Sequence, residues 1–176
     1  SLVILAFLTG IPGRGVAAVA GMTLGARAAS VLTFPIEALT LTLAIISGHL
    51  LGAGKRGKLY AYGLSMALKA GLTFCLPAIL LVLFGRQVAA PLGTDPAVLE
   101  AAALYLAFAG AGLPFTVFAG ILGGVFTGTG ATWIPCFAGL VSMWLIRVPL
   151  AAVLGWWLGL EERGIYAAML ASWVFQ

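Results

Sequence analysis

Long apolar runs alternate with short polar connections along most of the chain. Each complete run reaches or exceeds the roughly 20 residues that a helix needs to cross a bilayer. The runs are uniformly apolar and do not alternate over about ten residues, which favours helices over the strands of a β-barrel. The pattern predicts complete spans at about 16–51, 59–85, 97–127 and 132–158, with partial spans at 1–10 and 164–176.

The stretch from Phe108 to Pro149 holds two of these runs, joined by an uncharged Gly/Thr turn at Thr127–Thr132. Gly120, Gly124 and Gly128 recur every four residues, so they share one face of the first helix. Within lipid, small residues on one face let a neighbouring helix approach closely. We expect a tight transmembrane helical hairpin here, inside an all-α polytopic bundle that forms a single lobe.

Proline and aspartate positions predict where the helices bend and begin. At 1.5 Å per residue the run at 16–51 is about 54 Å long, far more than the roughly 30 Å hydrocarbon core. Pro35 is its expected kink because proline removes one helical hydrogen bond, and Pro77 lies inside the next run. Asp95 followed by Pro96 predicts a helix start, with an acceptor at the N-cap and proline at the first helical position.

Composition places the chain in the integral-membrane class. It is 62% hydrophobic and 8% charged, against about 45–50% and about 25% in soluble domains. The net charge of +4 does not indicate a nucleic-acid partner, because three of the nine basic residues, Lys55, Arg56 and Lys58, share one loop. The chain starts within an apolar run and ends in a run too short to span, so we expect a fragment of a longer membrane protein.

Basic residues predict the orientation. Cytoplasmic loops carry an excess of Lys and Arg, so the loop with Lys55, Arg56 and Lys58 is expected in the cytoplasm. Counting spans from there also places the Thr127–Thr132 turn on the cytoplasmic side. The loops around Arg14, at 86–100 and at 161–163 would then lie outside, the last as a short charged loop.

Glu37 is the only carboxylate deep inside a predicted span. An ionisable residue within the membrane is a functional candidate by default. It follows Pro35 by two residues, where a kink would leave backbone carbonyls free to bind a cation, and both features suit ion coupling in a transporter. The alternative is that Glu37 is a structural partner for a basic residue on another helix.

Four other residues in or near spans carry a charge or can acquire one. Arg27 either snorkels to the outer interface or has a function. Lys69 pairs with Glu37 across helices or lines an aqueous cavity. Arg147 reaches the outer interface or anchors a neighbouring helix, and His49 is an interface residue or a pH sensor.

Enzyme motifs and metal-ligand spacings are missing from the sequence. The Gly-rich segment at 51–58 lacks the GxxxxGK[ST] spacing, and there is no HExxH or GxSxG. Cys75 and Cys136 lie in separate apolar runs, where small core residues are expected in place of a disulfide or a metal pair. We expect no catalytic residue, no cofactor and no metal, with the lipid bilayer as the chief partner.

An ordered set of short motifs resembles the multidrug and toxic compound extrusion (MATE) transporters. The motifs are Val16–Val19, Gly48–Lys55 (GHLLGAGK), Asp95–Pro96 leading into Ala101–Leu106, Gly124–Pro135 (GVFTGTGATWIP) and Arg147–Ala151 (RVPLA). Together they cover nearly the whole chain. They correspond to the second six-helix lobe of the family, from late in the seventh helix to partway through the twelfth.

The resemblance implies a twelve-helix protein of two similar lobes, of which the first is missing from this chain. Such a protein exports small cationic or amphipathic substrates in exchange for H⁺ or Na⁺, across the plasma membrane, which is the inner membrane in bacteria. Two departures stand out. Ala29 occupies the place of a glutamate that some members carry in the eighth helix, and the tenth-helix equivalent has only Glu100, at its outer end. The resemblance therefore transfers no coupling residue.

Two other functions remain open from the sequence. A flippase of the same superfamily would move lipid-linked sugars, and Arg27, Lys69 and Arg147 could hold their pyrophosphate. A non-transporting membrane subunit or a membrane enzyme would need a partner or a further domain.

Overall fold

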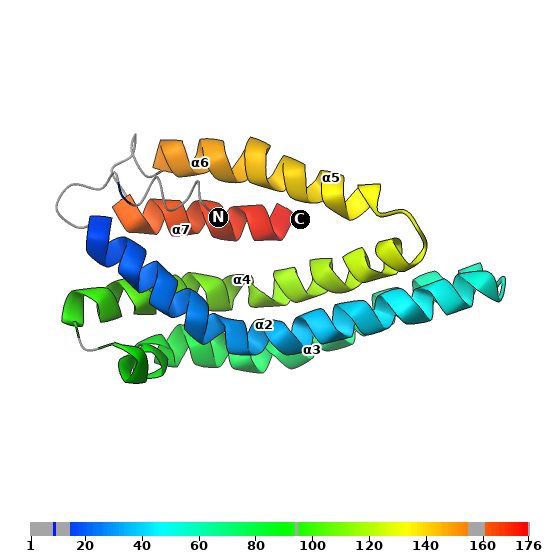
Figure 1. Cartoon of the computed structure of the whole chain (residues 1–176), viewed down its shortest axis with the longest axis horizontal. Coiled ribbons are helices and arrows are strands. Elements are labelled where there is room, and N and C mark those ends of the chain that lie inside the picture. Colours follow the sequence, from blue (N-terminus) through cyan, green and yellow to red (C-terminus); the bar gives the residue numbers. More distant parts are fainter. Residues whose placement is uncertain (1–8, 10–14, 94, 155–160, 176) are drawn as a thin grey trace.

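A computed structural model of the chain describes residue 9 and residues 15–93, 95–154 and 161–175. The regular elements within these ranges are helices (Figure 1): α2 (Gly15–Gly52), α3 (Arg56–Ala89), the short η1 (Ala90–Leu92), α4 (Pro96–Gly128), α5 (Trp133–Val141), η2 (Ser142–Arg147), α6 (Val148–Ala152) and α7 (Glu161–Phe175). Three of them, α2, α3 and α4, and the continuous segment Trp133–Ala152 are long and apolar enough to cross a membrane. The all-α polytopic transmembrane bundle is therefore confirmed.

The four long helical segments coincide with the four complete spans expected from the hydrophobic pattern. The expected partial span at 1–10, apart from Thr9, lies outside the described residues, as does the end of the expected span at 132–158. The last partial span corresponds to α7.

The charged residues Glu161 to Arg163 belong to the first turn of α7, so the expectation of a charged loop there is wrong. Acidic residues are stabilised at a helix N-terminus by the positive end of the helix dipole, which favours extending the helix back to this segment.

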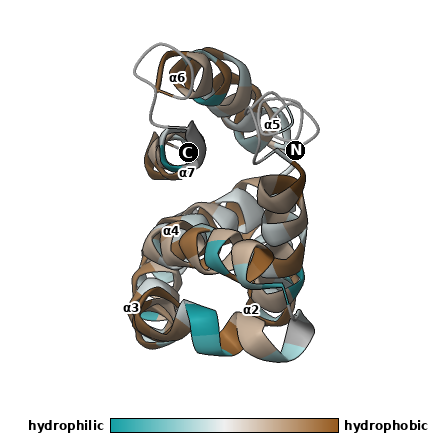
Figure 2. Cartoon of the chain, turned by 90° about the vertical axis from the view of Figure 1, so that its left-hand side faces the viewer, coloured by the Kyte–Doolittle hydropathy of each residue, from teal (hydrophilic) through white to brown (hydrophobic). Residues whose placement is uncertain are grey.

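Two groups of helices make up the fold. Seen end-on, α2, α3 and α4 lie together, with α5, α6 and α7 on the other side (Figure 2). α4 is the central helix, because it packs against α2, α3 and α7. α2 and α4 run in the same direction, and α3, which connects the end of α2 to the start of α4, runs in the opposite direction (Figure 1). The buried core follows from this arrangement, with residues such as Met22, Leu81, Leu106 and Tyr166 meeting between the helices.

The expected tight hairpin between α4 and α5 is wrong in its packing. The turn at 129–132 is present, but the two helices diverge beyond it, and α7 fills the space between α4 and α6 (Figure 1). The physical reason is that the glycine face of α4 is occupied by α2. A Cβ added to Gly120 would lie 3.4 Å from Thr40 Oγ1, and one added to Gly124 or Gly128 would collide with the backbone carbonyl of Thr40 or Ala44.

Local chemistry at the helix ends follows the sequence closely. The carboxylate of Asp95 accepts a hydrogen bond from the backbone N–H of Ala97 at 3.0 Å, which caps α4 at its start. Gly54 and Gly130 adopt φ values of 73° and 83° in the two turns where the chain reverses. Only glycine adopts this left-handed conformation at little cost, so both turns need glycine at these positions.

The helices bend at some prolines and elsewhere. α2 changes direction midway along its length (Figure 1), in the part that contains Pro35. α3 departs from helical geometry at Phe84, with φ −115° and ψ 18°, and not at Pro77. α4 contains Pro114. The segment Ser142–Arg147 forms wider π-helical turns, with the backbone N–H of Val148 bonded to the carbonyl of Met143. Pro149 cannot donate to the carbonyl of Leu145, which weakens the α-helical pattern at this point.

Contact between α2 and α4 predicts the effect of enlarging a glycine. We expect Gly124→Ala to destabilise the full-length protein by about 1–3 kcal/mol, because the added methyl group would meet the rigid backbone of Thr40. The control is Gly52→Ala, since a Cβ at Gly52 meets nothing within 4 Å. The measurement is the thermal unfolding midpoint of both variants in the same detergent. Equal midpoints would contradict this packing.

Candidate functional site

A stripe of polar residues runs along the middle of α2. Its members are spaced by four, three, three and four residues, so they recur with the period of a helix. They are Thr23, Arg27, Ser30, Thr33 and Glu37, of which Ser30 is half-buried and the others are exposed. We call this set the α2 polar stripe.

The hydroxyl groups of the α2 polar stripe are satisfied by the helix itself. The Thr23 hydroxyl donates to the carbonyl of Val19 at 2.8 Å, that of Ser30 to Arg27 at 2.6 Å, and that of Thr33 to Ser30 at 2.9 Å. Facing lipid would therefore cost these hydroxyl groups little free energy. The cost would be large for the charges of Arg27 and Glu37, because a charged group that faces hydrocarbon loses its hydration without compensation. The exposed side of α2 around these two charges is therefore suited to a water-containing space.

Helix register places Glu37 and Lys69 at the same depth. Glu37 follows Ile36, whose side chain lies 4.0 Å from a Cβ built on Gly120 of α4. Lys69 lies between Gly63, which packs against Val125, and Gly71, which packs against Pro114. Both charges thus lie beside the second half of α4, toward Gly128. Glu37 is also more than about 20 Å from either end of α2, since the helix rises 1.5 Å per residue.

Glu37 and Lys69 do not form an ion pair with each other. Among the described residues, Glu37 and Lys69 take part in no ion pair with each other or with another side chain. Both are exposed, on different helices. The alternative in which Glu37 pairs with Lys69 therefore does not occur among the described residues, and Glu37 is exposed.

Lys69 stands on a face of different character from the α2 polar stripe. Leu64, Leu68, Leu72 and Leu76 recur every four residues on α3 with 49%, 52%, 73% and 68% of their surfaces exposed. This leucine face has the composition expected of a surface that contacts lipid. Lys69 is about 20 Å from the start of α3, so its four-carbon stem carries the ammonium group only part of the way toward the membrane surface.

Arg27 and His49 are exposed and lie toward opposite ends of α2. Arg27 follows Gly25 by two residues, and Gly25 packs against Tyr105 in the first half of α4. His49 is in the last turn of α2, beside Gly48, where a Cβ would lie 3.3 Å from the carbonyl of Gly128. His49 is thus level with the turn between α4 and α5.

Arg147 is the one charge of the predicted set that the structure places in contact with another helix of the described part. Its Nε donates a hydrogen bond to Ser172 Oγ at 2.8 Å, and its guanidinium lies 5.8 Å from the ring centroid of Trp173. The Ser142 hydroxyl donates to the backbone carbonyl of Ser172 at 2.5 Å. Of the two expectations for Arg147, anchoring a neighbouring helix fits these contacts.

Aromatic rings continue the Arg147 cluster into the core. Trp173 packs directly on Gly112 of α4, where no larger side chain would fit beside the indole ring. Two turns along both helices, Tyr105 and Tyr166 meet edge to face with centroids 5.6 Å apart, and Phe108 lies 6.1 Å from the Tyr166 ring. Sequence reasoning missed Ser172 and Trp173, because they lie 25 and 26 residues from Arg147 and only helix packing brings them together.

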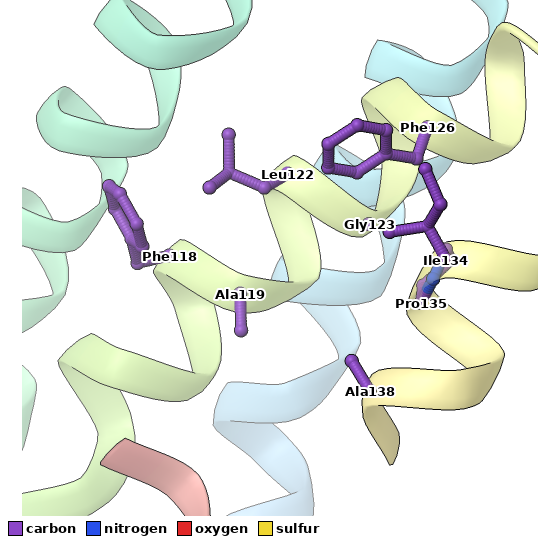
Figure 3. Close-up of a pocket in the computed structure, with 8 residues that line it drawn as sticks. All are labelled: Phe118, Ala119, Leu122, Gly123, Phe126, Ile134, Pro135 and Ala138. Carbon is purple, nitrogen blue, oxygen red and sulfur yellow. The ribbon is translucent and has the colours of Figure 1, made fainter. Parts of the chain in front are cut away.

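A small cavity of about 150 Å³ lies between α4 and α5 (Figure 3). The side chains that line it are all apolar: Phe118, Ala119, Leu122, Gly123, Phe126, Ile134, Pro135 and Ala138. It offers no side chain that could hold an ion. Cys136 is exposed and Cys75 half-buried, both as free thiols, and the described residues contain no group of three or more His, Cys, Asp or Glu side chains.

Comparison with known families now identifies the class. The helices and intramembrane charges define a multi-pass membrane protein, and the MatE family model matches residues 1–153. The chain therefore belongs to the MatE family, whose members are transporters. The resemblance found in the sequence motifs is thus confirmed. Nothing matches the chain in a comparison with curated proteins.

Contact between Arg147 and Ser172 predicts a stability effect. We expect Ser172→Ala to cost about 1.5–3 kcal/mol, the usual worth of a hydrogen bond to a charged group, because it removes the acceptor of the Arg147 Nε. Ser65→Ala on α3 is the control, since its half-buried hydroxyl has no hydrogen bond among the described residues. Thermal unfolding of the full-length variants measures the difference. A Ser172→Ala midpoint equal to that of Ser65→Ala would contradict the anchoring role.

Proposed function

We propose that this chain forms one lobe of an antiporter that exports cationic or amphipathic compounds in exchange for H⁺ or Na⁺. The observation that carries the proposal is the exposed carboxylate of Glu37 in the middle of α2, at the end of the α2 polar stripe. Among the described residues this carboxylate forms no ion pair. Its charge would be unfavourable against lipid. The proposal places this side of α2 toward a second lobe, with the transport path between the two.

Apolar neighbours of Glu37 suit an amphipathic cation. Phe34 and Leu41 lie three residues before and four residues after Glu37, so they share its side of the helix. Their surfaces are 69% and 67% exposed. An organic cation could place its charge at the carboxylate and its apolar part on these two side chains, and a phenyl ring also attracts cations.

A single carboxylate explains how such a protein would exchange two cargoes. A proton or a sodium ion neutralises Glu37 and removes the attraction for an organic cation, so the two bind in competition. Coupling then requires that the accessible side of the site changes between the two bound states. The closely packed α2, α3 and α4 would move as one body during this change, since the interface between α2 and α4 has no space for sliding.

The place of action is proposed to be the bacterial inner membrane, and no catalysis or cofactor is proposed. Lys55 and Lys58, which are exposed at the turn between α2 and α3, would lie on the cytoplasmic side.

A flippase for lipid-linked sugars is the second candidate. The observation in its favour is that Arg27, in the α2 polar stripe, forms no ion pair among the described residues. A pyrophosphate group would neutralise its charge. Glu37 weighs against this candidate, because a carboxylate in the same space repels a polyanion.

Neutralising Glu37 tests the antiporter. We expect Glu37→Gln to lower gradient-driven efflux of ethidium at least tenfold, because the amide lacks the negative charge that attracts an organic cation and does not exchange a proton. Efflux is measured in cells that express the full-length protein under imposed pH and Na⁺ gradients. Glu100→Gln is the matched control, since Glu100 is an exposed carboxylate near the start of α4.

Two outcomes would contradict the proposal in different ways. Unchanged efflux in Glu37→Gln would reduce Glu37 to a structural residue and move the coupling to another part of the protein. Failure of the correctly inserted wild-type protein to move ethidium in either gradient would overturn the multidrug antiporter and favour the flippase.

A further inference from the structure

Arg147 carries a positive charge within the helical bundle without an acidic partner among the described residues. From its surroundings we infer that Arg147, together with Ser172 and Trp173, forms a binding site for an oxyanion, namely a carboxylate or phosphate group. The site lies between η2 and α7, away from the α2 polar stripe. It is independent of the proposed antiport, because it concerns binding and not exchange.

Free donors at Arg147 point to a ligand. A guanidinium group has five N–H donors and no acceptor. In the described part of the chain, one of the five is used, by the Nε hydrogen bond to Ser172 Oγ. The two terminal NH₂ groups therefore keep four N–H donors for an acceptor from outside. Their parallel arrangement matches the two oxygens of a carboxylate or phosphate, which bind such a fork in bidentate fashion.

The carboxylates whose side chains the structure describes do not supply the counter-charge. Arg147 contacts the turn of α7 that packs on Gly112, in the middle of α4. Glu37 is instead level with Gly120 of α4. Asp95 and Glu100 lie at the start of α4. Glu161 and Glu162 start α7, ten or more residues before Ser172, which corresponds to about 15 Å along the helix. A buried or half-buried charge without a partner is costly, so a counter-ion from elsewhere would stabilise it.

Packing holds the guanidinium in one orientation before any ligand arrives. The Trp173 ring lies against Gly112 on α4 and presents its face to Arg147 at 5.8 Å. The Ser142 hydroxyl fixes the carbonyl of Ser172, whose side chain receives the Arg147 Nε bond. A donor group that is already oriented loses less conformational freedom on binding, which raises the affinity for a ligand.

The height of Arg147 in the bundle allows two sources for the oxyanion. Arg147 is 14 residues beyond Trp133, which begins α5, so it lies about 20 Å from that end of the bundle. Trp173, which lies under the guanidinium, packs on Gly112, the central residue of α4, so the site lies near the middle of the bundle. An anionic lipid that enters between the helices could bring its headgroup there, and so could the acidic group of a small compound.

Binding of two unrelated oxyanions to the purified full-length protein tests the inference. The probes are phosphatidylglycerol, with phosphatidylcholine as the lipid that lacks net charge, and benzoate, with benzamide as its neutral counterpart. Apparent dissociation constants are measured by thermal shift in neutral detergent. We expect at least one anionic probe to bind more tightly than its neutral counterpart, and Arg147→Gln to weaken that binding at least tenfold.

Matched variants keep the test decisive. Arg86→Gln removes an exposed arginine of α3 and should leave the affinity unchanged. If Arg147→Gln does not fold, Arg147→Lys keeps the charge but loses the planar fork, and should weaken binding several-fold. An effect with phosphatidylglycerol alone identifies a lipid headgroup as the source, and an effect with benzoate identifies a free carboxylate. Anion binding that neither Arg147 variant weakens, or no preference for either anion in the wild type, would overturn the inference.

Discussion

The close contact between α2 and α4 is the interaction on which the rest of the structure depends. Gly124 and Gly128 leave room for the backbone of Thr40 and Ala44, so the two helices touch without intervening side chains. This contact fixes the rotation of α2 about its axis. Ile36 is consequently buried against α4, while Glu37 next to it stays exposed. A small-residue interface thus decides where a charge is presented within the membrane.

The intramembrane charges lie in two different environments in this fold. On α2, Arg27 and Glu37 remain exposed and without ion pairs in the described part, which suits a surface that meets water and changing ligands. On η2, Arg147 is held by a serine and a tryptophan of α7, which suits a fixed position. The first arrangement fits a transport path and the second fits a permanent site, so the two need not serve the same step.

Much of the fold could be predicted from the sequence, because hydrophobic run length and turn chemistry are local. The start of α4 at Asp95–Pro96 and the glycine-containing turn at 129–132 are examples. Tertiary packing could not be predicted. The glycine face of α4 gave no sign of whether α2 or α5 would cover it, and the contact of Arg147 with Ser172 joins residues 25 positions apart. The α2 polar stripe could have been found, since its helical spacing is visible in the sequence.

The central claim is that the exposed polar side of α2 borders water and not lipid. Spin labels placed one at a time from Thr23 to Leu41, in the full-length protein in bilayers, test it most directly. Collisions with a water-soluble nickel complex and with lipid-soluble oxygen are compared at each position, and labels from Leu64 to Leu76 on α3 give the lipid-facing reference. The structure predicts nickel maxima at the stripe positions, repeating with the helical period. Oxygen maxima there, as on α3, would contradict it.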